Sequence, residues 1–111
     1  MSAQGEITGL IEKGCRFEGN LTFTGTVRIA GELVGSVFTN DTLVISEEAV
    51  VDADIKADVV IIYGNVKGNV SAVSRVEIKK PARFEGKVSA PSLIVEEGVI
   101  FHGETRIKDN Y

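Results

Sequence analysis

The sequence predicts an all-β protein of one domain, a right-handed parallel β-helix of about six three-stranded coils around a triangular apolar core. One apolar pattern, with inward residues 2, 4, 2 and 4 positions apart, occurs in Val76–Val88 and again 17 residues later in Leu93–Thr105. Apolar residues two positions apart share one face of a strand. The composition agrees, because the chain is 43% hydrophobic but only 6% aromatic, with 12 glycines and 2 prolines. Such a repeat indicates a coil of short stacked strands.

The first strand of each coil begins 16 to 18 residues after the previous one. Its inward pairs are Gly9/Ile11, Val27/Ile29, Leu43/Ile45, Val60/Ile62, Val76/Ile78 and Leu93/Val95. This variable period argues against a left-handed hexapeptide helix, which keeps multiples of six, and right-handed crossovers are the rule for parallel strands. The β-helix domain is predicted over residues 9–107, with short tails at 1–8 and 108–111.

Two further strands complete each coil. The inward residues of the second are Cys15/Phe17, Leu33, Ala49/Val51, Val66, Ala82/Phe84 and Val99/Phe101. Those of the third are Leu21/Phe23, Val37/Thr39, Ile55/Ala57, Val70/Ala72, Val88/Ala90 and Thr105/Ile107. A glycine column precedes the third strand at Gly19, Gly35, Gly68, Gly86 and Gly103, with Ala53 as the exception. The glycines predict a corner that needs positive φ or close backbone approach, and the small Ala57, Ala72 and Ala90 predict a second, tight corner.

Composition excludes several classes of function. The net charge of −4 argues against nucleic-acid binding through a broad basic surface. The single cysteine, Cys15, excludes an internal disulfide and fits a reducing compartment. No apolar run approaches the roughly 20 residues of a membrane helix, and the first nine residues lack a signal-peptide pattern. A cytoplasmic protein is therefore expected.

No catalytic residue, metal site or cofactor is predicted. His102 is the only histidine, and strand alternation turns it outward beside the inward Phe101. Cys15 is predicted to be a small buried hydrophobe rather than a nucleophile. Gly64–Asn69 lacks the G-x-x-x-x-G-K-[ST] spacing of a phosphate loop. The corner carboxylates Glu47, Glu48, Glu96 and Glu97 have no long loop to form a glycosidase cleft.

Charges alternate between neighbouring corners. Lys79 and Lys80 align one coil away from Glu96 and Glu97, which predicts a ladder of opposite charges on the surface. The main effect of this ladder would be to fix the register of the coils. A more specific alternative is that these charges form a docking patch for a partner protein.

The two ends of the coil carry the functional prediction. A β-helix exposes unpaired amides and carbonyls over an apolar core at its first and last coils, and solenoids usually cap them. Here about eight residues precede the first coil and four follow Ile107, too few for a cap. An end-to-end polymerisation interface is therefore predicted at Ile11, Phe17, Val99, Phe101, Thr105 and Ile107.

About residues 9–107 resemble the bactofilin family of bacterial cytoskeletal proteins. The resemblance is carried by Val27–Val37 (VRIAGELVGSV), Gly64–Val70 (GNVKGNV) and Ala82–Val88 (ARFEGKV), with an echo of the last at 99–105. It implies a right-handed β-helix that polymerises without nucleotide into filaments lacking polarity. It also implies filaments, often at the membrane, that place wall-modifying enzymes and include other bactofilins. Many members carry an apolar or basic N-terminal membrane segment; Met1–Gly9 has neither, which puts membrane contact in doubt.

Two other classes of function stay open at this point. One is a left-handed β-helix enzyme of the acyltransferase type, which would form trimers around a catalytic histidine. The other is a monomeric binding module that uses its charged face. The state of the protein in solution distinguishes the three hypotheses. A cytoskeletal protein would form filaments, an acyltransferase-like enzyme would form a trimer, and a binding module would stay a monomer.

Overall fold

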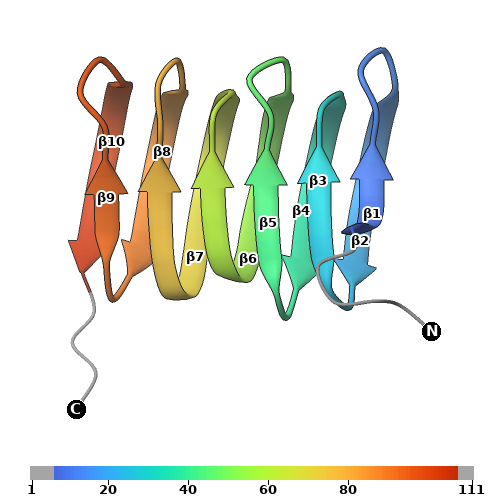
Figure 1. Cartoon of the computed structure of the whole chain (residues 1–111), viewed down its shortest axis with the longest axis horizontal. Coiled ribbons are helices and arrows are strands. Elements are labelled where there is room, and N and C mark those ends of the chain that lie inside the picture. Colours follow the sequence, from blue (N-terminus) through green and yellow to red (C-terminus); the bar gives the residue numbers. More distant parts are fainter. Residues whose placement is uncertain (1–6, 108–111) are drawn as a thin grey trace.

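A computed structural model describes residues 7–107 as one continuous parallel sheet that winds around itself (Figure 1). Its strands are β1 (Ile7–Ile11), β2 (Arg16–Phe23), β3 (Thr26–Ile29), β4 (Glu32–Thr39), β5 (Thr42–Ile45), β6 (Val50–Ile62), β7 (Asn65–Ile78), β8 (Arg83–Ala90), β9 (Leu93–Val95) and β10 (Ile100–Ile107). Residues 1–6 and 108–111, which hold most of the two predicted tails, lie outside the described residues.

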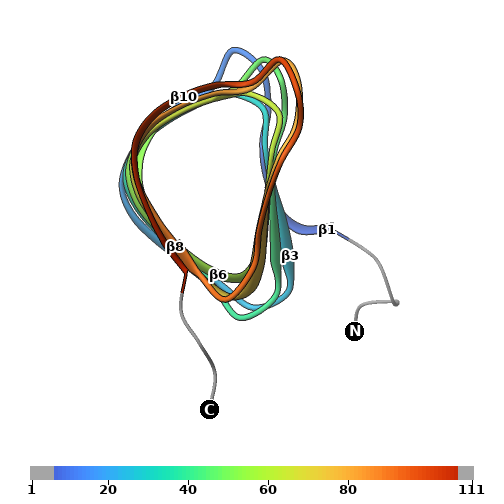
Figure 2. The same ribbon diagram turned by 90° about the vertical axis from the view of Figure 1, so that its left-hand side faces the viewer.

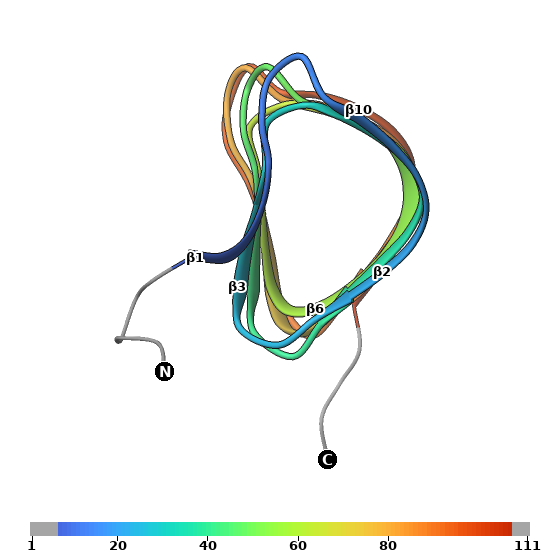
Figure 3. The same ribbon diagram turned by 90° about the vertical axis from the view of Figure 1, so that its right-hand side faces the viewer.

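The strands form two ladders around a rounded triangular ring, as the end-on views of Figures 2 and 3 show. One ladder stacks the short strands β1, β3 and β5, the second halves of β6 and β7, and β9. The other stacks the long strands β2 and β4, the first halves of β6 and β7, β8 and β10. Each ladder thus has six passes, in close agreement with the six predicted coils. A coil is one pass of the short-strand ladder followed by the next pass of the long-strand ladder. The coils are numbered in chain order, from coil 1 (β1 and β2) to coil 6 (β9 and β10).

The coil is right-handed, as predicted: in Figure 1 the short strands run upward in front, the long strands run downward behind, and the chain advances from right to left. A left-handed acyltransferase-like coil is therefore wrong for this chain. The extents of 34 × 32 × 24 Å make the molecule a short prism, about as wide as it is long.

The predicted division into three strands per coil is wrong in one respect. The second and third predicted strands are one bent strand, because parallel pairing continues through the glycine column, as at Gly19–Gly35 and Gly86–Gly103. The chain bends at each glycine without leaving the ladder. The glycine column therefore marks a bend inside a strand and not a corner between two strands.

Four of the bend glycines are required for two reasons. Gly35, Gly68, Gly86 and Gly103 have φ between 130° and 150°, a region that L side chains rarely adopt. A Cβ on Gly86 would also lie 1.9 Å from the carbonyl oxygen of Gly68 in the preceding coil. Ala53 is the exception because its φ is not positive, and its methyl group lies buried in the core.

We expect Gly86→Ala to lower the free energy of unfolding by roughly 2–3 kcal/mol, since it adds both backbone strain and a clash with backbone atoms. Gly14→Ala is the matched control, because Gly14 has φ +90° but open space around its Cβ. The free energy of unfolding of this control should fall by only about 1 kcal/mol. Urea unfolding followed by circular dichroism measures both, and equal losses would show that the close approach at Gly86 has no energetic weight.

The inward columns predicted from the sequence form the core. Leu33, Val51, Val66 and Phe84 stack in neighbouring coils, and each is at most 2% exposed. The small residues of the predicted tight corner, Ala57, Ala72 and Ala90, are all buried, and Ala57 and Ala72 lie within the long strands β6 and β7. Burial of this continuous apolar stack is the main stabilising term of the fold.

The corners between short and long strands come in two lengths. Four-residue corners occupy 12–15, 46–49, 79–82 and 96–99, and each is closed by a hydrogen bond from the backbone N–H of its last residue to the carbonyl oxygen of its first. Two-residue corners at Ala30–Gly31 and Tyr63–Gly64 pack closely against the four-residue corner of the preceding coil. A Cβ on Gly64 would lie 2.2 Å from the carbonyl oxygen of Ser46, so only glycine fits there. The long corners of coils 1, 3, 5 and 6 therefore protrude at the top of Figure 1.

The predicted burial of Cys15 is wrong. Cys15 ends the long corner of coil 1, and its side chain is exposed. It stands in the same column as the buried Ala49 and Ala82, but those residues lie in coils that have a neighbour on both sides. The first coil has a neighbour on one side only, which leaves this position open to solvent.

Candidate functional site

The candidate site is the pair of end faces, defined as the outer sides of coil 1 (β1 and β2) and coil 6 (β9 and β10). Within residues 7–107, β1 pairs only with β3, and β2 pairs only with β4. At the other end β9 pairs only with β7, and β10 pairs only with β8. Each end face thus presents strand edges whose backbone donors and acceptors have no partner strand in the described part of the chain.

The N-terminal end face is built on the inward residues of β2. Phe17 packs over the buried Leu33, and Leu21 packs over the buried Val37. Phe17, Leu21 and Phe23 are only half-buried, because no coil lies beyond them. Ile11 is covered more fully and is 9% exposed. The face is therefore largely apolar, with Cys15 at one corner.

The C-terminal end face centres on Phe101. Its ring stacks on the ring of Phe84, with centroids 5.2 Å apart and an angle of 14° between the planes. Phe84 is fully buried beneath it, while Phe101 keeps its second face half open. Val95 is inward in pattern, yet it is 45% exposed because coil 6 is the last coil described. This arrangement could accept another apolar layer.

The structure gives different surroundings to the six residues of the predicted interface. Ile11, Phe17, Val99 and Phe101 lie in the end coils with their side chains turned toward the core, and Thr105 is exposed in β10. The backbone of Ile107 ends β10, but its side chain lies outside the described residues. The prediction omitted Leu21, Phe23, Leu93 and Val95, which belong to the same end coils. The column pattern already contained them, since every inward residue of an end coil lacks a covering neighbour.

The sides of the prism hold the histidine and the corner carboxylates that were considered in the sequence. His102 is exposed, as predicted, and so are Glu47, Glu48, Glu96 and Glu97. In residues 7–107 no three His, Cys, Asp or Glu side chains gather closely enough to hold a metal ion. That part of the chain also has no helix long and apolar enough to cross a membrane.

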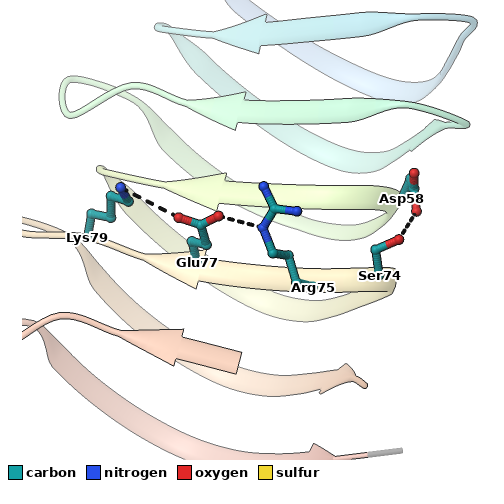
Figure 4. Close-up of polar contacts among 5 residues, drawn as sticks. All are labelled: Asp58, Ser74, Arg75, Glu77 and Lys79. Carbon is teal, nitrogen blue, oxygen red and sulfur yellow. Dashed lines mark hydrogen bonds and ion pairs between the residues drawn. The ribbon is translucent and has the colours of Figure 1, made fainter. Parts of the chain in front are cut away.

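The charge ladder predicted between coils 5 and 6 has a different form. The carboxylate of Glu96 accepts a hydrogen bond from the backbone N–H of Lys80 at 2.8 Å, and not from a lysine ammonium group. Lys79, in the corner just after β7, instead has its Nζ 3.5 Å from Glu77 Oε1, and Arg75 Nε donates to the other oxygen of Glu77 at 2.6 Å (Figure 4). The ion pairs of Lys79 and Arg75 therefore lie within coil 5 and do not link it to coil 6.

The Arg75 guanidinium, which donates a hydrogen bond to Glu77, lowers the pKa of that carboxyl from its ordinary value of 4.5, and Lys79 adds to the shift. A carboxyl with a lowered folded pKa adds stability above its unfolded pKa and loses it as the pH falls through the folded pKa. Arg75 and Lys79 are 45% and 38% exposed, so solvent screens the pairs and their contribution stays below about 1 kcal/mol.

Glu77→Gln should therefore flatten the fall in melting temperature below about pH 4.5, while it lowers the melting temperature slightly at pH 7. Thermal melts between acid and neutral pH measure this effect. Glu85→Gln on the next strand is the control, because Glu85 has no ion-pair partner among the described residues. Identical acid profiles for the two variants would remove Glu77 from the acid response.

Comparisons with known proteins extend over nearly the whole coil. The family model of the bactofilins, described as polymer-forming cytoskeletal, matches residues 9–106. The chain is 31% identical over 86 residues to bactofilin BacO of Myxococcus xanthus (strain DK1622), across 78% of this chain and 68% of BacO. It is 30% identical over 91 residues to bactofilin BacP of the same strain, across 82% of this chain. The match spans only 38% of the length of BacP.

Two solved structures are similar in fold. One is a chain from the cryo-EM reconstruction of Thermus thermophilus bactofilin double helical filaments, with a TM-score of 0.84, 31% identity, and coverage of 89% of this chain and 98% of that chain. The other is the cytoskeletal bactofilin BacA solved by solid-state NMR, with a TM-score of 0.81 and 23% identity. It covers 93% of this chain and 99% of that chain, and its likeness concerns the fold alone.

Proposed function

Because the chain belongs to the bactofilin family of polymer-forming cytoskeletal proteins, we propose that its two end faces are the contacts of an end-to-end homopolymer. The observation that carries the proposal is the half-open apolar layer at each end, with Phe17 on one face and Phe101 on the other. A second prism on each face would bury these side chains and pair the free strand edges. Apolar burial and backbone pairing need no nucleotide, so none is expected in assembly.

We propose further that the prisms alternate in direction and give a filament without polarity. Such a filament uses two different two-fold contacts, one between N-terminal end faces and one between C-terminal end faces. The family resemblance supports this arrangement. The aromatic stack also favours it, because a second Phe101 could continue the Phe84–Phe101 column with the same kind of ring.

Electron microscopy of the purified protein without nucleotide tests assembly directly, with filaments as the expected result. Protein that stays monomeric at high concentration and at several salt concentrations contradicts the proposal. Polarity needs a distance measurement, for which Cys15→Ser removes the only cysteine and Glu32→Cys provides an exposed spin-label site in coil 2. Alternating prisms give two nearest-neighbour label distances, one across each kind of joint. A single repeated distance would indicate a polar, head-to-tail filament.

We also propose that these filaments are a cytoplasmic scaffold for wall-modifying enzymes or other bactofilins, and that the chain is not itself an enzyme. The cytoskeletal character of its relatives supports a structural role. Deletion of the gene should then alter cell shape, and a fluorescent fusion should form discrete structures that disappear when the end faces are mutated. A normal cell shape together with diffuse fluorescence would contradict this role.

A further inference from the structure

A second surface of the prism has the form of a contact site. The four long corners protrude from one edge, and together they are called the corner ridge: 12–15, 46–49, 79–82 and 96–99 (Figure 1). The short corners of coils 2 and 4 leave gaps between them. The ridge bridges the first gap itself, because Lys13 Nζ of coil 1 lies 2.9 Å from Glu48 Oε2 of coil 3. Coil 2 therefore does not separate its neighbours at this edge.

The charges on the ridge change sign across the second gap. Coil 3 carries Glu47 and Glu48, coil 5 carries Lys79 and Lys80, and Tyr63 lies in the short corner between them. Beyond the basic corner, the corner of coil 6 is acidic again, with Glu96 and Glu97. Two steps of the ladder, about 10 Å, separate the acidic corner from the basic one. Glu48 is paired with Lys13, and Lys79 with Glu77. Among residues 7–107, the carboxylate of Glu47 and the ammonium group of Lys80 have no ion-pair partner, and both residues are exposed.

We propose that the corner ridge is a lateral contact between two filaments of this chain, in which prisms lie side by side and antiparallel. A two-fold axis beside Tyr63 places the acidic corner of coil 3 against the basic corner of coil 5 of the second copy, and the reverse. A parallel alignment would instead oppose acid to acid and base to base. With the two prisms in register, the charges of coils 3 and 5 thus match a second copy of the same chain only in the antiparallel orientation.

This proposal rests on the proposed function, because it needs filaments. One ridge-to-ridge contact between exposed charges is weak on its own. In a filament the same contact recurs at regular intervals, and once one pair of prisms has met, the next pairs form at high effective concentration. If the prisms alternate in direction, each filament contains prisms of both orientations. A prism in one filament can therefore meet an antiparallel prism in the neighbouring filament. Lateral pairing is therefore a property of the polymer.

The test is a charge swap that leaves Glu48 and Lys79 in place. Glu47→Lys and Lys80→Glu should each reduce the fraction of laterally paired filaments in electron micrographs at low salt at least tenfold. The double variant E47K/K80E should restore it, because it exchanges the two signs. Asp52→Lys in coil 3 and Lys87→Glu in coil 5 are matched controls on another face, and both should pair like the wild type. Thermal melts check that every variant is folded.

Salt gives a second readout that separates the ridge from the end faces. At 1 M salt the screening length falls to about 3 Å, so paired filaments should separate into single ones. Wild-type filaments that stay single at low salt overturn the lateral contact but not the end-to-end polymer. Single swaps that pair normally, or a double swap that fails to pair, also overturn it. Wild-type protein that forms no filament at all overturns both proposals.

Discussion

Phe101→Arg should abolish filaments and leave a discrete dimer. The substitution puts a guanidinium group on the C-terminal end face, where Phe101 stacks on Phe84 and keeps its other side half open. In a contact between two C-terminal faces that charge would be buried without a partner, at a cost of roughly 3–5 kcal/mol. The N-terminal face is untouched at Phe17 and Ile11, so two prisms can still join there.

Analytical ultracentrifugation measures the product, and Phe38→Arg is the control. Phe38 is also a large apolar side chain, 49% exposed, but it lies on the side of β4. The control should polymerise like the wild type. A monomeric Phe101→Arg product would indicate head-to-tail stacking or an N-terminal contact too weak to survive alone. Unchanged filaments would remove Phe101 from the interface.

Val66→Asp should prevent folding at neutral pH. Val66 is 2% exposed and lies in the stack between Val51 of coil 3 and Phe84 of coil 5. A carboxylate there would meet only apolar neighbours in its column, and burial of an unpaired charge costs several kcal/mol. Since a small domain has a total stability of about 5–15 kcal/mol, one such group in the central stack is enough to unfold it.

Circular dichroism and one-dimensional NMR distinguish a folded chain from an unfolded one. Lys67→Asp is the control, because Lys67 is the adjacent residue in β7 and is exposed on the outer surface. The control should keep the wild-type spectrum and a similar melting temperature. A folded Val66→Asp protein would mean that the side chain at 66 reaches solvent and that the register of this coil differs from the one described.

The core could be predicted from the sequence because each inward position recurs in neighbouring coils. The column of Leu33, Val51, Val66 and Phe84 lies in adjacent coils, as its spacing predicted. The bend at the glycine column could not be identified as part of a strand from composition. A glycine with positive φ is typical of a turn between strands, and only the pairing of Gly86 with Gly103 shows that the ladder continues through it.

The end faces were predictable in place but not in detail. The column pattern identifies Phe17 and Phe101 as residues of terminal coils, yet it gives no measure of exposure. The pattern therefore places the exposed Cys15 in the core, and the predicted interface leaves out Val95, which is 45% exposed. The hydrogen-bond donor to Glu96 was also not predictable from the sequence, because the turn at 79–82 directs the backbone N–H of Lys80 toward that carboxylate. Every residue except proline has a backbone N–H, so the sequence does not show which of these groups donates to Glu96.

The strand pairing of each coil with its immediate neighbours makes the fold resemble a one-dimensional chain of coupled units. In such a system stability propagates from unit to unit, and the terminal units have half the coupling of the interior ones. Coils 1 and 6 should accordingly open first, and their amides should exchange with solvent faster than those of β6 and β7. Assembly supplies the missing neighbour, so polymerisation and the last step of folding become one cooperative process. The melting behaviour of the coil should then depend on protein concentration, as it does for any fold completed by association.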